Sequence, residues 1–314
     1  MKTKILKLFF LLAIFFALSN FARAAISFDS NGRWETTFNC PEWIQNNALS
    51  CDSLDLFGSW FTTMENKGSQ ITASANNPLG VGGGFRHWIG DYIQNAVNIS
   101  NDNSGPIGPE FPSPQQELWI RWYLRFEEGM AWDDATYTGT KLYPYYHKLL
   151  YIYSAGTTQV IPGFVISDNM ALTAQATSNY YQVATPSGSG DWNRINGGNT
   201  GDGEFHLYEV HIKMDTNQTD GVGEFWIDGA LVASNYAVDW SDGDAFAKQG
   251  WEYIKIGNNQ AWSHNNRAVY EDFDDIVIYN TTPPNLDTNG NPFIGPIGYG
   301  DMTPPSVPSN LSVL

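Results

Sequence analysis

Four polar side chains in one short stretch of the sequence have the spacing and the chemistry to bind a sugar. Glu209, His211 and Lys213 alternate with apolar residues, and Trp226 has a similar place in a second alternating run after the polar turn 215–223. Because side chains of a β-strand alternate between its two faces, this pattern predicts a hairpin with one polar face. The turn is rich in Asp, Asn and Gly, which tolerate tight bends. A carboxylate, an imidazole, an ammonium and an indole on one face suit sugar recognition.

Further cationic and titratable residues fall on three other predicted strands. They are Arg86 and His87 in 85–89, Trp119, Arg121, Tyr123 and Arg125 on one face of 117–126, and His147 and Tyr151 on one face of 145–154. Breaking a uronate polymer by elimination needs a cation to neutralise the carboxylate, a base to remove the proton at C5, and an acid for the leaving oxygen. These residues can supply all three groups.

We therefore expect one cationic groove. The expected catalytic residues are His147, Arg121, Tyr151, His211 and His87, and the expected substrate-binding residues are Arg86, Tyr123, Arg125, Lys213, Glu209, Trp226 and Trp119. A simpler interpretation stays open: the histidines are hydrogen-bonded structural groups, and the alternating arginines are the solvated face of a strand.

The elements that must position these residues are strands. No convincing amphipathic helix interrupts the chain, and alternating runs separated by turn residues recur at 28–38, 69–75, 85–89, 117–126, 145–154, 163–168, 208–228, 251–257 and 271–279. Many short strands joined by loops of mixed length predict an all-β, two-sheet antiparallel sandwich of the jelly-roll kind. We place this domain at residues 25–280.

The two ends of the chain differ from this body in composition. Three lysines precede an apolar run at 8–18, and small residues end at Ala24, which predicts a signal peptide over 1–24 and a secreted protein, extracellular or periplasmic. The run is shorter than the roughly 20 residues that a spanning helix needs. Residues 281–314 are rich in Pro, Gly and Asn and predict a linker or surface tail. The last residues resemble the junction that opens fibronectin type III domains.

The net charge and the two cysteines indicate which partners and which cellular compartment fit the protein. Removing the four basic residues of the predicted leader lowers the 16 Lys and Arg residues to 12, against 33 acidic residues. Such a surface should repel nucleic acid and anionic membranes, and it is compatible with structural calcium. Cys40 and Cys51 are close in sequence and predict a disulfide in an exported protein. We expect a monomer that binds polysaccharide.

Four segments carry a family resemblance. ELWIRWYLRF, HKLLYIY, FHLYEVHIKMDTNQTDGVGEFWIDGALV and FDDIVIY, in that order, resemble the concanavalin A-like lectin/glucanase (jelly-roll) superfamily, and within it secreted bacterial heparin-lyase-like and polysaccharide-lyase-like domains. The resemblance covers 28–279 and implies two antiparallel sheets with a glycan groove on the concave one. It also implies that Asp274 helps to hold a structural calcium ion with groups from the first strand, for which Asp29 and Glu35 are the candidates. A solvated acidic strand edge is the alternative.

The resemblance does not select one activity. The alternating carboxylates of β-glucanases are absent, which lowers the hydrolase interpretation. The alginate-lyase signatures R-x-E-x-R, Q-I-H and Y-x-K-x-G-x-Y are absent as such. The favoured function is a polysaccharide lyase acting by β-elimination on a uronic-acid glycan, and the alternative is a non-catalytic lectin-like or laminin-G-like binding module of a multidomain protein. Cations and histidines that converge on one groove would favour the lyase. A groove lined by Trp and Asn/Asp would favour the binding module, and a filled groove would favour a structural domain.

Overall fold

The computed structural model describes residues 26–38, 69–76, 83–89, 108–130, 147–155, 163–166, 172–176, 181–184, 201–256, 265 and 267–297. The predicted leader, Cys40, Cys51 and the last residues of the predicted tail lie outside these ranges, so those predictions stay untested. Among the helices that the structure describes, none is long and apolar enough to cross a membrane.

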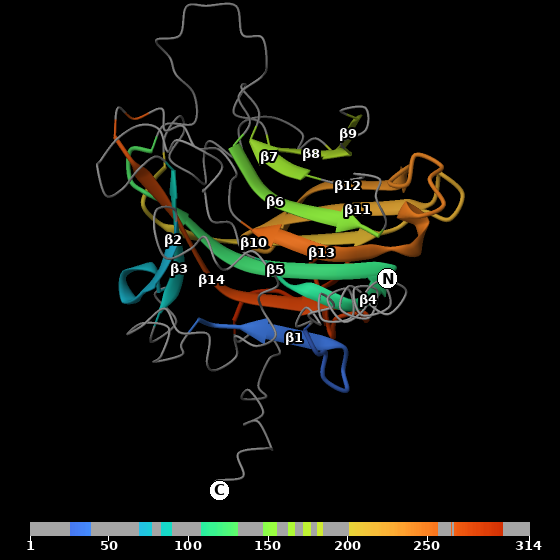
Figure 1. Cartoon of the computed structure of the whole chain (residues 1–314), viewed down its shortest axis with the longest axis horizontal. Helices are drawn as coiled ribbons and strands as arrows, with labels where there is room; N and C mark the ends of the chain where they lie inside the picture. Colours follow the sequence, from blue (N-terminus) through green and yellow to red (C-terminus); the bar gives the residue numbers. More distant parts are fainter. Residues whose placement is uncertain are drawn as a thin grey trace, which may run out of the picture.

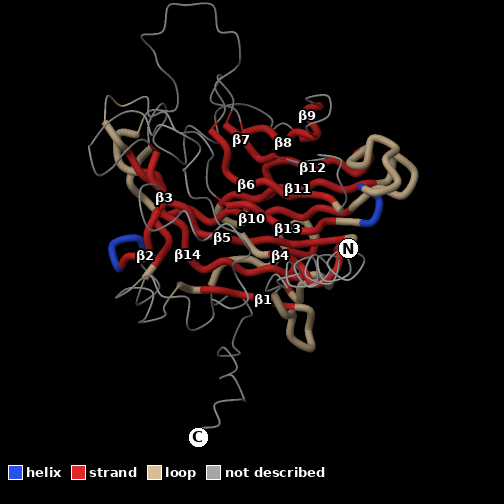
Figure 2. Tube along the Cα trace, viewed as in Figure 1, coloured by secondary structure: helices blue, strands red, loops and turns tan. Residues whose placement is uncertain are grey.

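The described chain is almost entirely β-structure (Figures 1 and 2). Its strands are β1 (Arg33–Thr36), β2 (Ser69–Thr72), β3 (Gly84–Ile89), β4 (Glu110–Gln115), β5 (Glu117–Phe126), β6 (His147–Ser154), β7 (Gly163–Ile166), β8 (Leu172–Ala176), β9 (Tyr181–Ala184), β10 (Phe205–Lys213), β11 (Gly221–Ile227), β12 (Ala230–Val238), β13 (Trp251–Ile256), β14 (Val269–Tyr279), β15 (Asn285–Leu286) and β16 (Pro292–Phe293). Two short 3₁₀ helices lie at Ala73–Ala75 and Ala247–Gln249.

The strands form two large antiparallel sheets. The eight-stranded sheet has the order β12-β11-β10-β5-β14-β3-β2, with β1 also paired to β14. The six-stranded sheet has the order β4-β13-β6-β7-β8-β9. Neighbours far apart in sequence, such as β5 between β10 and β14, are held by ladders of paired residues, continuous between β5 and β10 and with one irregularity between β5 and β14. The predicted all-β antiparallel sandwich is confirmed.

Alternation along β5 shows how the sequence builds the core. Ile120, Trp122 and Leu124 point into the main apolar cluster, together with Ile152 of β6 and Ile254 of β13. Because this cluster draws on both sheets, the sheets pack face to face, and the remaining face of each sheet points outward on opposite sides of the sandwich.

A segment predicted to lie outside the domain packs against the eight-stranded sheet. Residues 285–297, which we call the strap, contain β15 and β16, and these two strands pair only with each other in a separate two-stranded sheet. The carboxylate of Asp287 shapes their turn, because its Oδ1 accepts hydrogen bonds from the N–H groups of Asn289 and Asn291 at 2.8 Å each. Phe293 and Ile294 are buried. The predicted boundary at residue 280 therefore leaves out a packed part of the molecule.

Candidate functional site

The sheet assignment separates the residues that we expected in one groove. Arg121 and His211 lie on β5 and β10 of the eight-stranded sheet, whereas His147 and Tyr151 lie on β6 of the six-stranded sheet. The outer faces of the two sheets look in opposite directions. The expectation of a single groove is therefore wrong, and each face has to be considered separately.

The strap covers the middle of the eight-stranded face. Glu209 accepts hydrogen bonds from the N–H groups of Ile294 at 2.5 Å and Gly295 at 2.9 Å. Arg121 Nη1 donates to the carbonyl oxygen of Gly295 at 3.0 Å. Glu209 and Arg121 are both buried, with exposed fractions of 1% and 3%. These side chains, predicted to contact substrate, are occupied by the protein's own backbone.

The predicted aromatic contacts are covered in the same way. Trp119 Nε1 donates to the carbonyl oxygen of Pro292 at 3.2 Å, and Tyr123 Oη accepts from the N–H of Ile297 at 3.3 Å. Trp226 is buried, and its Nε1 donates to Asp287 Oδ2 at 3.0 Å. This is the filled groove that favours a structural role for Trp119, Trp226, Tyr123, Arg121 and Glu209.

Burial changes the pKa values of two acids on the eight-stranded sheet. Burial raises the pKa of the Glu209 carboxyl to about 7, against the opposing effects of the two N–H donors and of Arg121. Burial likewise raises the pKa of Asp275 to about 6, although Arg121 acts to lower it. Asp275 has a positive φ of 46° at an irregularity where β14 gains a residue relative to β5. Raised pKa values here reflect a desolvated interior, which is not by itself a sign of catalysis.

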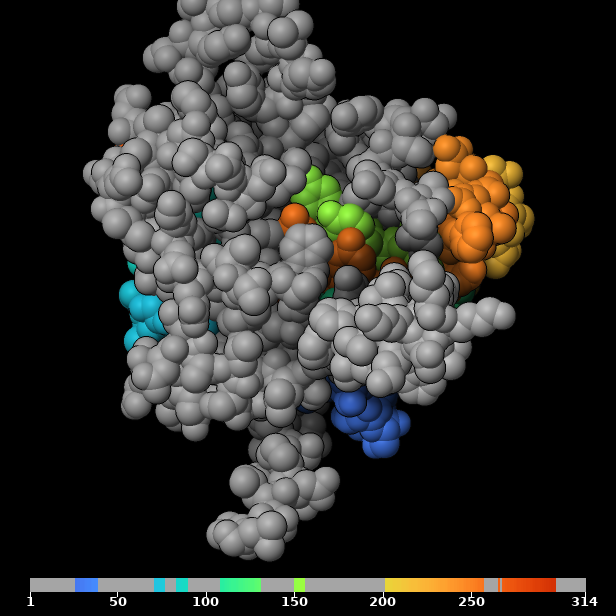
Figure 3. Space-filling view, viewed as in Figure 1, coloured from blue at the N-terminus to red at the C-terminus, as the bar shows by residue number. Residues whose placement is uncertain are grey.

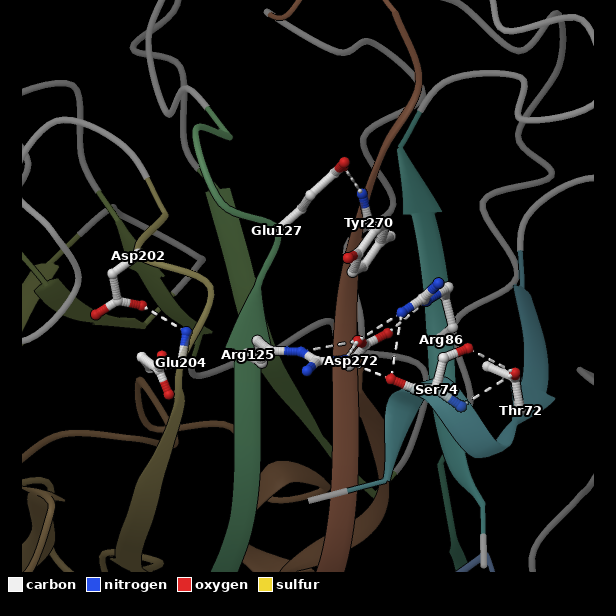
Figure 4. A network of polar contacts seen from close by, with 9 residues as sticks. All are labelled: Thr72, Ser74, Arg86, Arg125, Glu127, Asp202, Glu204, Tyr270 and Asp272. Carbon is white, nitrogen blue, oxygen red and sulfur yellow. Dashed lines mark hydrogen bonds and ion pairs between the residues drawn. The ribbon is translucent and has the colours of Figure 1, made fainter. Parts of the chain in front are cut away.

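Arg86 and Arg125, expected to bind substrate, form a buried ion network with Asp272 (Figure 4). Both guanidinium groups point at the Asp272 carboxylate: Arg86 donates to its two oxygens at 2.7 and 2.9 Å, and Arg125 donates at 2.5 and 3.1 Å. Arg125 also donates to the carbonyl oxygen of Ser74, and Arg86 stacks over the Tyr270 ring at 3.6 Å. The network joins β3, β5 and β14, so its evident role is to fix these strands.

The predicted catalytic histidines of this sheet also have structural partners. His87 points into the sandwich, is fully buried, and its Nδ1 lies 2.8 Å from Glu271 Oε1. It cannot reach a substrate on either face, so the prediction that it is catalytic is wrong. His211 lies between Glu224 at 2.6 Å and Glu117 at 2.9 Å and stacks on Trp119 with ring centroids 4.0 Å apart.

The local environment makes His211 a charged bridge. Burial opposes protonation, but hydrogen bonds and charges of Glu117 and Glu224 outweigh it and raise the pKa of His211. The two carboxylates occupy both ring nitrogens. Lys213, at the end of β10, is exposed.

The three predicted calcium ligands do not come together. Asp29 Oδ1 accepts from the N–H groups of Asn31 and Arg33, and Glu35 pairs with Arg33 at 2.7 Å. Glu35 is opposite Val277, three residues along β14 from Asp274, which is about 10 Å of strand. The described residues hold no cluster of three or more potential metal ligands. Calcium binding stays a prediction without a site.

The outer face of the six-stranded sheet carries a different set of side chains. Tyr153 of β6 and Tyr253 of β13 are opposite each other and stack with ring centroids 4.2 Å apart and an interplanar angle of 13°. Tyr151 is opposite Lys255 on the same pair of strands. Figure 3 shows coloured atoms of β6 and β13 at the surface on this side of the molecule.

The chemistry of this tyrosine face is aromatic and cationic. Tyr153, Tyr253 and Lys255 are half-buried, and Tyr151 is nearly buried. Burial raises the pKa of Tyr153, so its hydroxyl is protonated at neutral pH and can donate a hydrogen bond. His147 begins β6, and its side chain lies outside what the structure describes.

Sequence reasoning found Tyr151 and His147 but missed Tyr253 and Lys255. Their alternation in the predicted strand 251–257 was a usable signal. The run Tyr253-Ile-Lys255-Ile-Gly257 also fits the first five positions of the Y-x-K-x-G-x-Y signature. What the sequence does not show is that β13 pairs with β6, which places the two residues beside Tyr151 and Tyr153.

Comparisons with known proteins agree at the level of the fold. No family model matches the chain, and no curated protein matches it. The solved structures that it resembles include the cellulose-induced protein Cip1, at 18% identity over 69% of this chain and 88% of that chain with a TM-score of 0.40. They include the catalytic domain of a glycoside hydrolase family 131 protein from Coprinopsis cinerea, at 12% identity over 86% and 98% with a TM-score of 0.42.

A third similar structure is alginate lyase A1-II′, a member of polysaccharide lyase family 7. It is 11% identical over 80% of this chain and 95% of that chain, with a TM-score of 0.36. These neighbours are jelly-roll, concanavalin A-like proteins, as the resemblance in the sequence predicted. Identities and TM-scores this low say nothing about activity, so the function has to be argued from the residues.

Proposed function

We propose that the tyrosine face of β6 and β13 binds a polysaccharide and cleaves a uronic-acid glycan by β-elimination. The observation that carries this proposal is the register of the two strands, which places Lys255 opposite Tyr151 and directly beside the stacked Tyr153 and Tyr253. One cation among phenol groups, on an outward sheet face, is the set of groups that this elimination needs.

Each residue has a role in the proposed reaction. Lys255 neutralises the uronate carboxylate and so stabilises the charge that develops when the proton leaves C5. Tyr151, a base on the same face, takes that proton. Tyr153, kept protonated by burial, donates a proton to the leaving oxygen. The bond from C4 to this oxygen breaks and a C4–C5 double bond forms, so no water is consumed.

A non-catalytic binding module is the second candidate, and the aromatic stack is the observation that favours it. Flat aromatic rings on an outward sheet face bind the apolar faces of sugar rings without any chemistry. In that case Lys255 would contribute only charge attraction.

The test is incubation of the protein with a panel of uronic-acid polysaccharides while the ultraviolet absorbance of unsaturated uronate products is recorded. We expect a rise with at least one polymer, a loss of at least about 100-fold in rate for Tyr153→Phe, and a comparable loss for Lys255→Ala. Lys213→Ala and Tyr236→Phe are matched controls, because both residues lie on the eight-stranded sheet and should leave the rate unchanged. No absorbance change on any polymer, together with retention on a glycan column that Lys255→Ala weakens, would assign the face to binding alone.

A further inference from the structure

We propose that the outer face of the eight-stranded sheet is a docking surface for a hairpin-shaped segment, the protein's own strap, which opens without unfolding the sandwich. This proposal concerns the side of the molecule opposite the tyrosine face and does not depend on the activity proposed there. The occupant is the segment 285–297 itself.

The first argument is how the strap is held. Glu209 and Arg121 form a clamp on one short stretch of main chain: Glu209 accepts the N–H groups of Ile294 and Gly295, and Arg121 donates to the Gly295 carbonyl oxygen. Trp119 donates to the Pro292 carbonyl oxygen. Side chains of a folded sheet that satisfy the backbone of another segment are the means by which peptides are recognised in grooves.

The second argument is that the strap is separate from the rest of the fold. Its two strands pair with each other and add no strand to the eight-stranded sheet. The main apolar cluster contains no strap residue, and Ile294 belongs to a small satellite cluster with Trp119, Val277 and Tyr279. Opening the strap therefore breaks no ladder of the sandwich and leaves the main apolar cluster intact, and it exposes only the satellite cluster and the side chains that the strap covers. It can thus occur as a local opening that is separate from global unfolding.

The third argument is a glycine whose backbone conformation the docked strap uses. Gly295 has a φ of +76°, and a Cβ atom there would lie 3.0 Å from Cζ of Phe293. A left-handed conformation is costly for residues other than glycine. Gly295 thus allows the Ile294–Gly295 stretch to present its N–H groups to Glu209 and its carbonyl to Arg121.

Hydrogen exchange on the full-length chain tests the opening. We expect the amides of Ile294, Gly295 and Ile297 to exchange faster than those of Ile120 and Val210, and Gly295→Ala to accelerate only the strap amides by about tenfold. Glu224→Gln is the control: it changes a buried carboxylate of the same face whose partners are His211 and Tyr236, and it should leave the strap amides unchanged. A common rate for strap and core amides in the wild-type chain would overturn the proposal, because the strap would then be part of the cooperative fold.

Capture by a peptide tests the docking surface. The tethered strap competes at an effective concentration of the order of millimolar, so a biotinylated peptide of residues 285–297 is used in excess with the full-length Gly295→Ala chain. We expect this peptide to capture the variant more efficiently than the wild-type chain and a scrambled peptide to capture neither. Equal capture by both peptides, or capture by neither, would refute a docking surface.

Discussion

Replacing Asp272 by Asn should be among the most damaging single changes on the eight-stranded sheet. Asp272 is fully buried and is the shared acceptor of Arg86 and Arg125. An Asn side chain keeps the shape but removes the charge and turns one acceptor oxygen into an NH₂ donor that faces two guanidinium groups. Removing one partner of a buried ion pair typically costs about 3–5 kcal/mol, because the remaining charge is left uncompensated.

The expected loss lies at the lower end of that range. The Arg86 and Arg125 side chains are 11% and 23% exposed, so both can recover part of their hydration when Asp272 is neutralised. We expect a decrease of about 3 kcal/mol in the free energy of unfolding, which corresponds to a fall of about 6–12 °C in Tm for a domain of this size. The network links three strands, so the effect should appear in the global transition.

The assay is guanidinium chloride unfolding followed by tryptophan fluorescence, with the m-value compared between variants. Glu35→Gln is the matched control: Glu35 pairs with one arginine, Arg33, and its side chain is 26% exposed, so the loss should be about 0–1 kcal/mol. A loss for Asp272→Asn of less than about 1 kcal/mol, or equal to that of the control, would refute the reasoning that this buried network holds the strands together.

Two further substitutions probe buried polar groups, His211 on β10 and Asp215 in the turn after β10. Because the pKa of His211 is raised in the folded state, the stabilisation by its charged form is complete below the unfolded pKa of about 6.5 and is lost as the pH rises through the folded pKa. The difference in unfolding free energy between wild type and His211→Gln should therefore shrink as the pH is raised from about 6 to about 9. A constant difference would contradict the charged bridge. Asp215 is buried and accepts hydrogen bonds from the Ser241 N–H and hydroxyl and from the Gln218 N–H. Asp215→Ala should therefore lower the unfolding free energy by at least about 2 kcal/mol in denaturant titrations. No loss would show that the loops containing Gln218 and Ser241 are held by other contacts.

Alternation in the sequence was sufficient to predict which residues share a face. Ile120, Trp122 and Leu124 were assigned to one side of β5 and Arg121 and Tyr123 to the other, and the structure agrees. This works because an antiparallel strand in a two-layer sandwich has one face in the core. The hairpin of β10 and β11 was predicted for the same reason, with its turn marked by Asp, Asn and Gly.

Alternation does not say which sheet a strand joins, and this is why the candidate site was misplaced. His147 and Arg121 each lie in a strong strand pattern, yet the patterns are silent about the pairing of β6 with β13 and of β5 with β10. The sequence also does not show which polar residues of a strand are buried. His87 is buried and paired with the buried Glu271, yet in the sequence it resembles any other polar residue of a strand.

The strap was missed for a different physical reason. Its composition is that of a linker, rich in Pro, Gly and Asn. It is held by hydrogen bonds from its main chain to Glu209, Arg121 and Trp119 and by only two buried apolar side chains, Phe293 and Ile294. Long-range main-chain contacts leave no periodic signal in the segment itself. The residues that hold it were visible, but they were interpreted as ligands for a sugar.

The position of the strap also gives a site for attaching the protein to a surface. The described chain passes Tyr123 at Ile297, on the side of the sandwich that faces away from Tyr153, Tyr253 and Lys255. A bead, sensor surface or second protein module coupled at Ile297 would be attached on the side of the sandwich opposite the tyrosine face. Coupling through Lys255 would instead place the attached group on the tyrosine face. The choice of attachment site therefore decides whether a large polymer can reach that face.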